Sequence, residues 1–379
     1  MKKLASAFLN YRDLLTRVPV FVLVLVVLQA CKDKPIHLEG PTMGTHYSIK
    51  AEPDIKVDHA LLQQEVDELL KEINRQMSTY LSSSEIGRVN HTYEDKPMYI
   101  SSWFAQVLNY SLELAQDTQG FFDPTVGPLV NLWGFGPGVR KTKAPSQNEI
   151  KAVLKYVGYN RVRLKPADNE KWLLEKTDRR VRLDLSATAK GFAVDKVSEL
   201  LTLKGLVNHL VEIGGEIKVR GIKASGEPWV VAIEKPVQGQ RGGIQLKFPL
   251  KDYSIATSGS YRNFFEEGDK FYSHTINTRT GRPVPHGLLS VTVLDSSCMK
   301  ADGLATALMA MGPKLGLQYA EKSNIAAYFI IAPSVAKKPA TKEDAGEEEA
   351  EADVQLLTRA TKRFTELSGG VLKKAAQNP

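Results

Sequence analysis

Two oxygen-bearing side chains toward the C-terminal end of the chain are spaced for metal binding. Asp302 and Thr306 lie four residues apart in a run, 301–311, whose apolar spacing predicts a helix. Positions i and i+4 share one helix face, so a carboxylate and a hydroxyl there can ligate one hard cation such as Mg²⁺. Near a helix start, Asp302 can instead cap the helix or interact with its dipole. The pair is therefore a candidate Mg²⁺ site that has a purely structural alternative.

A second candidate is the stretch Leu-Asp-Leu-Ser-Ala-Thr-Ala-Lys-Gly-Phe, residues 183–192, where a predicted strand ends and a predicted helix begins. Small side chains at such a turn leave the first N–H groups of the helix accessible, and these groups can bind an anion. Lys190 adds a positive charge suited to phosphate. An ordinary strand–helix turn capped by Ser186 explains the same pattern.

Two polar stretches add groups for proton transfer and for phosphate or ribose binding. His274 lies between Ser273 and Thr275 in a strand-like run, and an imidazole is suited to general-base catalysis at neutral pH. It is one of seven histidines, most of which must serve packing or the surface. The Ser/Thr/Gly segment 254–261 offers hydroxyl and N–H groups, although turn formation explains it equally well.

The composition describes an ordinary globular chain of two or three domains, or one large domain. Its 379 residues are 42% hydrophobic and 25% charged, which excludes a collagen, a coiled coil or a wholly disordered chain. The net charge of +7 is spread along the chain without a basic cluster, so we expect no nucleic-acid partner. P-loop, dinucleotide-binding, nucleophile-elbow and zinc-ligand spacings are absent from the sequence.

The N-terminus has the pattern of a bacterial lipoprotein signal peptide. A basic start precedes the apolar run 18–28, which is too short for a membrane span of about 20 residues but suits a signal-peptide core. The run leads into Leu-Gln-Ala-Cys, which resembles a lipobox, so Cys31 is the expected lipidation site. The alternative is a short uncleaved anchor. We expect a protein lipid-anchored at the periplasmic face of a bacterial membrane, with Cys298 as its other thiol and no disulfide.

Helices and strands follow each other without strict alternation, which predicts an α+β fold of mixed, largely antiparallel sheets with flanking helices. Helices are expected at 58–77, capped by Asp58, and at 101–118, 149–157, 189–203, 301–311 and 313–321. Strands are expected at 43–51, 161–164, 180–185, 206–213, 216–219, 229–233, 244–248, 253–256, 288–294 and 326–331. Residues 82–96 are expected to form a polar loop, and 123–138 an ordered loop or a short helix.

Five segments follow from these patterns. We expect a signal peptide at 1–30, a polar tether at 31–40, and one domain at 41–333. The segment 334–353 is rich in Glu and lacks aromatic residues, so it cannot bury enough apolar area to order itself. We expect it to be a disordered insertion before a final element and tail at 354–379, where 355–367 forms a strand or a helix.

Taken in order, these stretches resemble the ApbE family, the FAD:protein FMN transferases. The matching stretches are 42–45, 78–80, 123–134, 184–192, 211–216 (Val-Glu-Ile-Gly-Gly-Glu), 254–260, 273–277, 280–281 and 301–306. The resemblance implies that FMN is transferred from FAD to a Thr or Ser hydroxyl of an acceptor protein and that AMP leaves. It also implies an acceptor that is a subunit of a membrane redox complex.

The resemblance assigns roles to individual residues. Mg²⁺ would be held by Asp302, Thr306 and the backbone carbonyl of Ala189, and His274 would take the proton of the acceptor hydroxyl. The residues implied to contact FAD are Met43, Tyr80, Phe121, Phe122, Asp123, Ser186, Lys190, Phe192 and Ile276. Family members commonly have an acidic residue or Gly within 184–192, where this chain has Ser-Ala-Thr-Ala; a carbonyl ligand does not depend on that difference.

Two other functions fit the same residues. One is an FAD hydrolase, which would use water in place of the acceptor hydroxyl. The other is a non-enzymatic flavin-binding lipoprotein. Mg²⁺-dependent release of AMP separates an enzyme from a binder, and covalent flavin on a partner separates a transferase from a hydrolase.

Overall fold

The computed structural model describes residues 34–370, except for 93–95, 139–140, 142, 168–170, 237–242, 261–263, 269, 285–286 and 334–355. The predicted signal peptide, Cys31 and the acidic segment 334–353 lie outside the described residues. Within the described part, no helix is long and apolar enough to cross a membrane.

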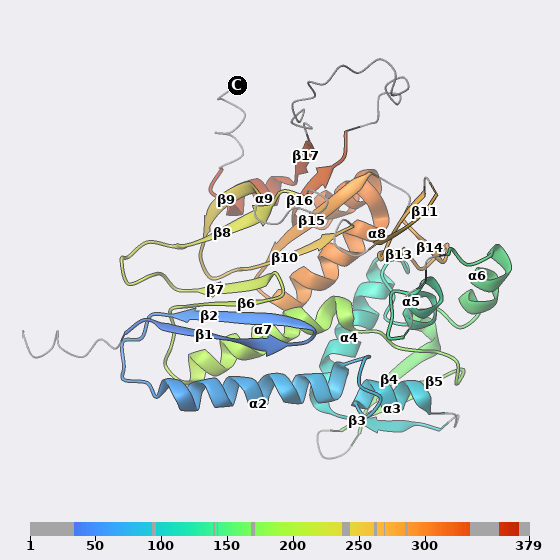
Figure 1. Ribbon diagram of the computed structural model, residues 1–379, viewed down its shortest axis with the longest axis horizontal. Helices are drawn as coiled ribbons and strands as arrows, with labels where there is room; N and C mark the ends of the chain where they lie inside the picture. The colour runs from blue at the N-terminus through green and yellow to red at the C-terminus, as the bar shows by residue number, and fades with distance from the viewer. Residues whose placement is uncertain are drawn as a thin grey trace, which may run out of the picture.

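An eight-stranded sheet forms the centre of the molecule (Figure 1). Each pair of neighbouring strands is antiparallel, which confirms the predicted α+β class. In spatial order the strands are β1 (Ile36–Thr42), β2 (Thr45–Ala51), β6 (His209–Ile213), β7 (Glu216–Arg220), β10 (Ser254–Gly259), β15 (Leu288–Asp295), β16 (Ala326–Ile331) and β17 (Leu357–Ala360). The predicted tether 31–40 is partly wrong, because β1 already begins at Ile36 and pairs with β2 along its whole length.

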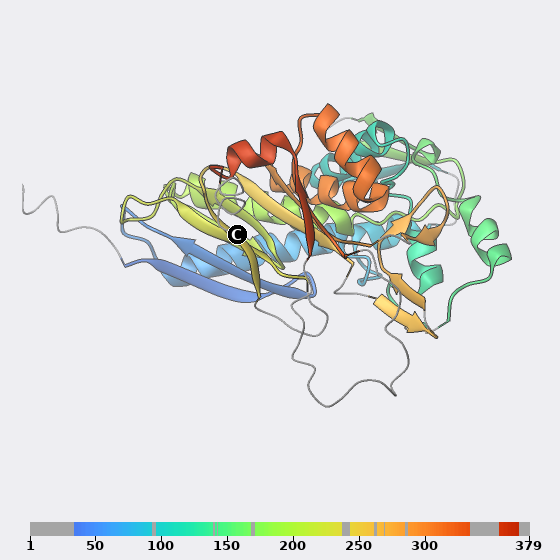
Figure 2. The same ribbon diagram turned by 90° about the horizontal axis from the view of Figure 1, so that it is seen from above.

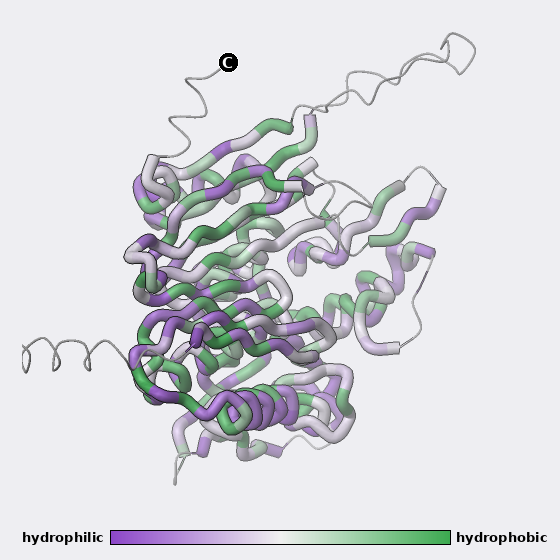
Figure 3. Tube along the Cα trace, turned by 60° about the vertical axis from the view of Figure 1, so that its left-hand side comes forward, coloured by the Kyte–Doolittle hydropathy of each residue, from purple (hydrophilic) through white to green (hydrophobic). Residues whose placement is uncertain are grey.

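The later strands of the sheet are covered on both faces, whereas β1 and β2 alternate buried and exposed residues. Along β16, Ala327 and Phe329 pack into one apolar core, and Tyr328 and Ile330 pack into another. The first of these cores lies under the helix α8 (Cys298–Lys322), and the helix α7 (Ser186–Leu203) packs in a neighbouring core with β1, β2 and β6. The second is formed with the hairpin β8 (Trp229–Glu234) and β9 (Ile244–Leu250) and with α9 (Lys362–Leu367). Figure 3 shows polar and apolar residues alternating along the strands.

The remaining elements surround this centre, and Figure 2 shows them from above. The helices are α2 (His59–Met77), α3 (Glu85–His91), α4 (Ser102–Asp117), α5 (Gly127–Trp133), α6 (Gln147–Leu154) and the short 3₁₀ helix η1 (Tyr159–Arg161). A three-stranded sheet contains β3 (Met98–Ile100), β5 (Trp172–Lys176) and β4 (Val162–Pro166). Two small hairpins are β11 (Phe264–Glu267) with β12 (Lys270–Ser273), and β13 (Ile276–Asn277) with β14 (Arg282–Pro283).

Several local expectations are confirmed. Asp58 caps α2 and accepts hydrogen bonds from the N–H groups of Ala60 and Leu61. The helices predicted at 301–311 and 313–321 are the two halves of α8, which is interrupted at Gly312, where φ is +81°. The segment 355–367, where a strand or a helix was expected, contains one of each: the strand β17 and then the helix α9.

Two expectations are wrong. The polar loop expected at 82–96 contains α3, which begins after Ser84, a residue whose side chain caps the N–H of Gly87. Residues 181–185 form no strand in the described part of the chain, and Arg180 lies in a turn. The side chain of Asn90 makes the hydrogen bonds to Leu183 that a neighbouring strand would make. It donates to the Leu183 carbonyl at 2.8 Å and accepts from the Leu183 N–H at 2.7 Å.

Candidate active site

A cavity of about 380 Å³ lies where α7, α8 and the ends of several strands meet the loops around α5. Its walls come from segments that are far apart in the sequence, which include the segment after α2, the turn between β6 and β7, and the bend between β12 and β13. The predicted site residues that line it are Tyr80, Phe121, Phe122, Asp123, Ser186, Lys190, His274, Ile276, Asp302 and Thr306. The structure therefore brings most of the candidate residues into one place.

Three predicted residues are not among those that line the cavity. Phe192 is only 1% exposed and packs edge-to-face on Trp103 in the core, and its expected contact with FAD stays a prediction. Met43 lies at the β1–β2 turn with φ of +48° and packs against the same core. Ala189 lies in the first turn of α7, between the lining residues Ala187 and Lys190. The expected roles of Met43 and of the Ala189 carbonyl stay predictions.

Three charged side chains on the cavity wall lie together, and we call them the cavity cluster: Lys190, Glu216 and Asp302. Glu216 and Asp302 are buried, and the Lys190 side chain is 30% exposed. The ammonium of Lys190 lies 2.6 Å from Oε1 of Glu216. Oδ2 of Asp302 accepts a hydrogen bond from the N–H of Gly191 at 3.0 Å. Oε2 of Glu216 is buried and has no hydrogen-bond partner among the described residues.

The charges in this cluster cancel only when one of its two carboxylates is protonated. Burial raises the pKa of Asp302 to about 7; Lys190 opposes the shift and Glu216 adds to it. Although burial acts in the other direction, the carboxylates of Glu216 and Asp302 raise the pKa of Lys190, so its ammonium stays charged. When all three side chains are ionised, two carboxylates face one ammonium, an excess of one negative charge.

The donor set fits a hard divalent cation. Asp302, the hydroxyl of Thr306 and the unsatisfied carboxylate oxygen of Glu216 all offer oxygen, the ligand atom that Mg²⁺ prefers. A dication would also offset the excess negative charge of the buried carboxylates. Spacing within one helix pointed to Asp302 and Thr306, but Glu216 had no assigned role. The sequence signal that could have identified Glu216 is its position directly after the Gly-Gly pair, where the chain turns from β6 into β7 beside the cavity.

Asp123 shapes the aromatic side of the cavity. Its carboxylate accepts bonds from the N–H and hydroxyl of Thr125 at 2.8 and 2.6 Å, and from the N–H of Tyr159 at 2.7 Å. Burial raises the pKa of Asp123, and these bonds oppose the shift. The carboxylate therefore holds the loop that presents Phe121 and Phe122 to the cavity.

His274 lies at the bend between β12 and β13, half-buried, on the wall that also contains Thr275 and Ile276. Its ring is edge-on to Phe135, with 6.4 Å between ring centroids. The end of β10 contributes Thr257, Ser258 and Gly259 to the same cavity, so hydroxyl and N–H groups lie on the wall beside an imidazole.

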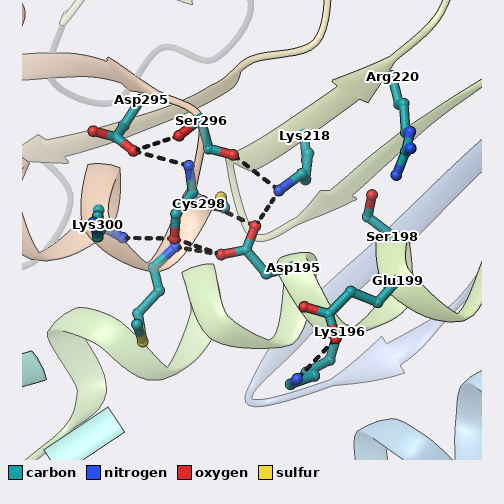
Figure 4. A network of polar contacts seen from close by, with 12 residues as sticks. Asp195, Lys196, Ser198, Glu199, Lys218, Arg220, Asp295, Ser296, Cys298 and Lys300 are labelled. Carbon is teal, nitrogen blue, oxygen red and sulfur yellow. Dashed lines mark hydrogen bonds and ion pairs between the residues drawn. The ribbon is translucent and has the colours of Figure 1, made fainter. Parts of the chain in front are cut away.

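A second group of polar residues, which we call the cap cluster, fixes the start of α8 (Figure 4). Asp195 on α7 accepts from the N–H groups of Cys298 and Met299, each at 3.0 Å, and from the Ser297 hydroxyl at 2.8 Å. Lys218 on β7 donates to Asp195 at 2.6 Å and to the Ser296 carbonyl at 3.0 Å. This cap holds α8 one turn before Asp302, which places that carboxylate beside α7.

Close packing of the two helices completes the arrangement. A Cβ atom at Gly191 would lie 2.3 Å from the Cys298 carbonyl oxygen, so only glycine allows α7 to approach α8 this closely. The approach is what lets the Gly191 N–H reach Asp302.

Comparison with known proteins gives one consistent result. The ApbE family model matches residues 43–329. A protein of Vibrio cholerae named FAD:protein FMN transferase is 45% identical over 312 residues, which cover 81% of this chain and 91% of the relative. A protein of the same name from Escherichia coli K12 is 35% identical, over 77% of this chain and 83% of the relative.

Solved structures agree. The flavin transferase ApbE from Vibrio cholerae has a TM-score of 0.75 and 39% identity, and the match covers 88% of this chain and 99% of the other. The apo flavinyl transferase ApbE from Pseudomonas stutzeri has a TM-score of 0.76 and 35% identity, with 90% and 98% covered.

Proposed function

The chain belongs to the ApbE family, and from this premise we propose that it transfers FMN from FAD to a Thr or Ser hydroxyl of an acceptor protein. The observation that carries the proposal is the meeting of the cavity cluster, the aromatic side chains of Phe121 and Phe122, and His274 in one cavity. Phosphoryl-group transfer needs charge neutralisation, positioning and an activated hydroxyl, and these three parts supply them.

In the proposed reaction the acceptor oxygen forms a bond to the phosphorus on the FMN side of the pyrophosphate. The bond from that phosphorus to the bridging oxygen breaks, and AMP leaves with the bridging oxygen. The hydroxyl proton passes to an imidazole nitrogen of His274. Lys190, which stays charged, offsets negative charge on the pyrophosphate, and Phe121 and Phe122 offer apolar faces to the flavin.

Asp302, Thr306 and the Ala189 carbonyl are proposed to hold Mg²⁺. When bound, Mg²⁺ supplies neutralisation of the charge that the pyrophosphate carries and develops. We further propose that Cys31 carries a lipid that anchors the protein at the periplasmic face of the membrane, where a redox-complex subunit is the acceptor. The lipobox-like sequence supports the anchor.

The test is incubation with FAD, Mg²⁺ and a candidate acceptor, read by in-gel flavin fluorescence of the acceptor. Fluorescent acceptor and released AMP in equal amounts support the transferase. AMP and FMN without covalent flavin would identify an FAD hydrolase, and FAD binding without AMP would identify a flavin-binding protein.

His274 provides the sharpest single variant. A general base typically contributes about 10²–10⁴-fold, so His274→Ala should lose that much transfer while it binds FAD and melts as the wild type does. A packing histidine would behave differently, because its removal would lower the melting temperature and the FAD affinity together. Transfer, affinity and melting temperature are therefore measured on the same sample, and near-normal transfer would remove His274 from the mechanism.

A further inference from the structure

Four exposed apolar side chains gather at one end of the molecule, and we call them the end patch: Ile55, Leu61, Leu203 and Val207. They are 46%, 52%, 86% and 45% exposed, respectively. An exposed leucine is common, but a leucine with 86% of its surface in water at a helix end, next to other exposed apolar side chains, is a feature that marks interaction surfaces.

The members of the end patch come from segments that contact one another. The Glu52 N–H donates to the Asn208 carbonyl at 2.9 Å, which ties the segment after β2 to the segment after α7. A Cβ at Gly205 would lie 3.1 Å from Cδ1 of Ile55. Lys204 forms an ion pair with Glu65, one helical turn after Leu61 on α2.

The end patch lies far from the cavity, because two helices run between them. The 18-residue helix α7 begins with Ser186 in the cavity wall and ends at Leu203; at 1.5 Å per residue it is about 27 Å long. The 19-residue helix α2 begins just before Leu61 and ends just before Thr79 and Tyr80, which line the cavity. Figure 1 shows α2 and α7 lying along the first strands of the sheet.

Strand β1, which follows the proposed lipid anchor at Cys31, begins at the same end of the molecule as the end patch. Ile36 at the start of β1 pairs with Ala51, which pairs with His209, two residues after Val207. Ile36 is the fifth residue after Cys31, and a fully extended chain covers at most about 3.6 Å per residue step, or about 18 Å. A lipid on Cys31 would therefore keep the end patch close to the bilayer surface.

We propose that the end patch rests on the lipid bilayer and that α2 and α7 hold the cavity about 27 Å away from it. The inference rests on the proposed anchor at Cys31. A second copy of the chain is a poorer occupant, because four side chains cannot provide the roughly 800 Å² per partner of a stable interface. The tether also holds this end at the membrane whether or not a protein partner is present.

The test uses the full-length lipidated protein with Leu203→Cys, labelled with an environment-sensitive fluorophore and reconstituted in phosphatidylethanolamine–phosphatidylglycerol vesicles. Cys298 is fully buried, so labelling is selective once Cys31 is acylated. The matched control is Leu315→Cys, which is 44% exposed on the half of α8 beyond the cavity. Nitroxide-bearing lipids should quench the label at 203 at least several-fold more than the label at 315.

Flotation of the same samples separates the anchor from the orientation. Protein that fails to float overturns both the anchor and this inference. Protein that floats while the two labels are quenched equally keeps the anchor and overturns the orientation. The third outcome concerns the protein in detergent. If the label at 203 becomes more protected from solvent as the protein concentration rises, a second copy of the chain covers the end patch, and this also overturns the inference.

Discussion

The cavity cluster and the cap cluster are built from the same three elements, α7, β7 and α8, yet they differ in how completely their charges are satisfied. In the cap cluster, Asp195 has four donors around its two oxygens, and Lys218 has both a carboxylate and a carbonyl to bond. In the cavity cluster, Glu216 keeps one buried oxygen without a partner among the described residues, and Asp302 accepts a hydrogen bond from the N–H of Gly191.

This difference separates a structural role from a binding role. A buried charge that the protein satisfies fully contributes to the geometry of the fold and asks for no ligand. A buried acceptor left without a donor costs free energy of folding, about 1–3 kcal/mol, which a bound cation can recover. The comparison predicts that substitutions in the cap cluster change stability and that substitutions in the cavity cluster change turnover.

The largest effect is expected for Asp302→Ala. Loss of the carboxylate should abolish transfer, a fall of at least ~10⁴-fold, because Mg²⁺ contributes several kcal/mol to such reactions. The melting temperature without metal should not fall, since a carboxylate whose pKa burial raises is removed. Mg²⁺ should raise the melting temperature of the wild type and leave that of the variant unchanged. Transfer by Asp302→Ala at the wild-type rate in EDTA would refute the metal site.

The opposite outcome is expected for Asp195→Ala. It leaves Lys218 without its carboxylate and the first N–H groups of α8 without a cap, so the free energy of unfolding should fall by about 3 kcal/mol, the low end for a broken buried ion pair. We expect the lower value because the Lys218 side chain is 21% exposed, so water partly solvates its charge. Denaturant unfolding measures the loss, and Asp195→Asn, which keeps an acceptor, should recover part of it. Lost transfer at unchanged stability would make Asp195 part of the active site instead.

A buried histidine extends the comparison to pH. Nδ1 of His209 faces the Leu206 carbonyl at 2.7 Å, which can only accept, so Nδ1 carries the proton and Nε2 accepts from the Ser198 hydroxyl at 2.7 Å. Burial lowers the pKa of His209 from 6.5 to about 4. Between these two pH values the unfolded chain binds more protons than the folded protein. The stabilisation is therefore complete above pH 6.5 and is lost as the pH falls toward 4, by roughly 3 kcal/mol in total.

His209→Asn should flatten that part of the curve of unfolding free energy against pH. The matched control is His46→Asn, the same substitution at an exposed histidine. An unchanged slope in His209→Asn would show that His209 is not the group that titrates.

The smallest effect is expected for Thr306→Ala. A neutral hydroxyl offers one ligand oxygen without charge, worth about 1–1.5 kcal/mol, so transfer should fall roughly tenfold. Titration with Mg²⁺ should show a weaker apparent affinity in this variant, and saturating Mg²⁺ should restore most of the rate. If Thr306→Ala lost as much transfer as Asp302→Ala, the charge of a ligand would not determine how much that ligand contributes to the rate.

Local sequence patterns determined much of this protein. The cap of α2 by Asp58 depends on residues two and three positions away, and the break in α8 depends on Gly312 beside Pro313. The i, i+4 spacing of Asp302 and Thr306 placed both on the cavity wall. Such features are readable because one turn of helix or one tight turn contains all the interacting atoms.

The contacts that join distant segments exist only in the folded protein. Asn90 replaces a neighbouring strand for Leu183 across 93 residues, and the Gly191 N–H meets Asp302 across 111 residues. Phe192 faces the core although Lys190, two residues earlier, lines the cavity, because the packing of α7 against its neighbours selects which helix face is buried. Glu216 acquires its role because β7 begins beside α7 and α8. No short sequence window contains both sides of such a contact, so the chain had to fold before these roles existed.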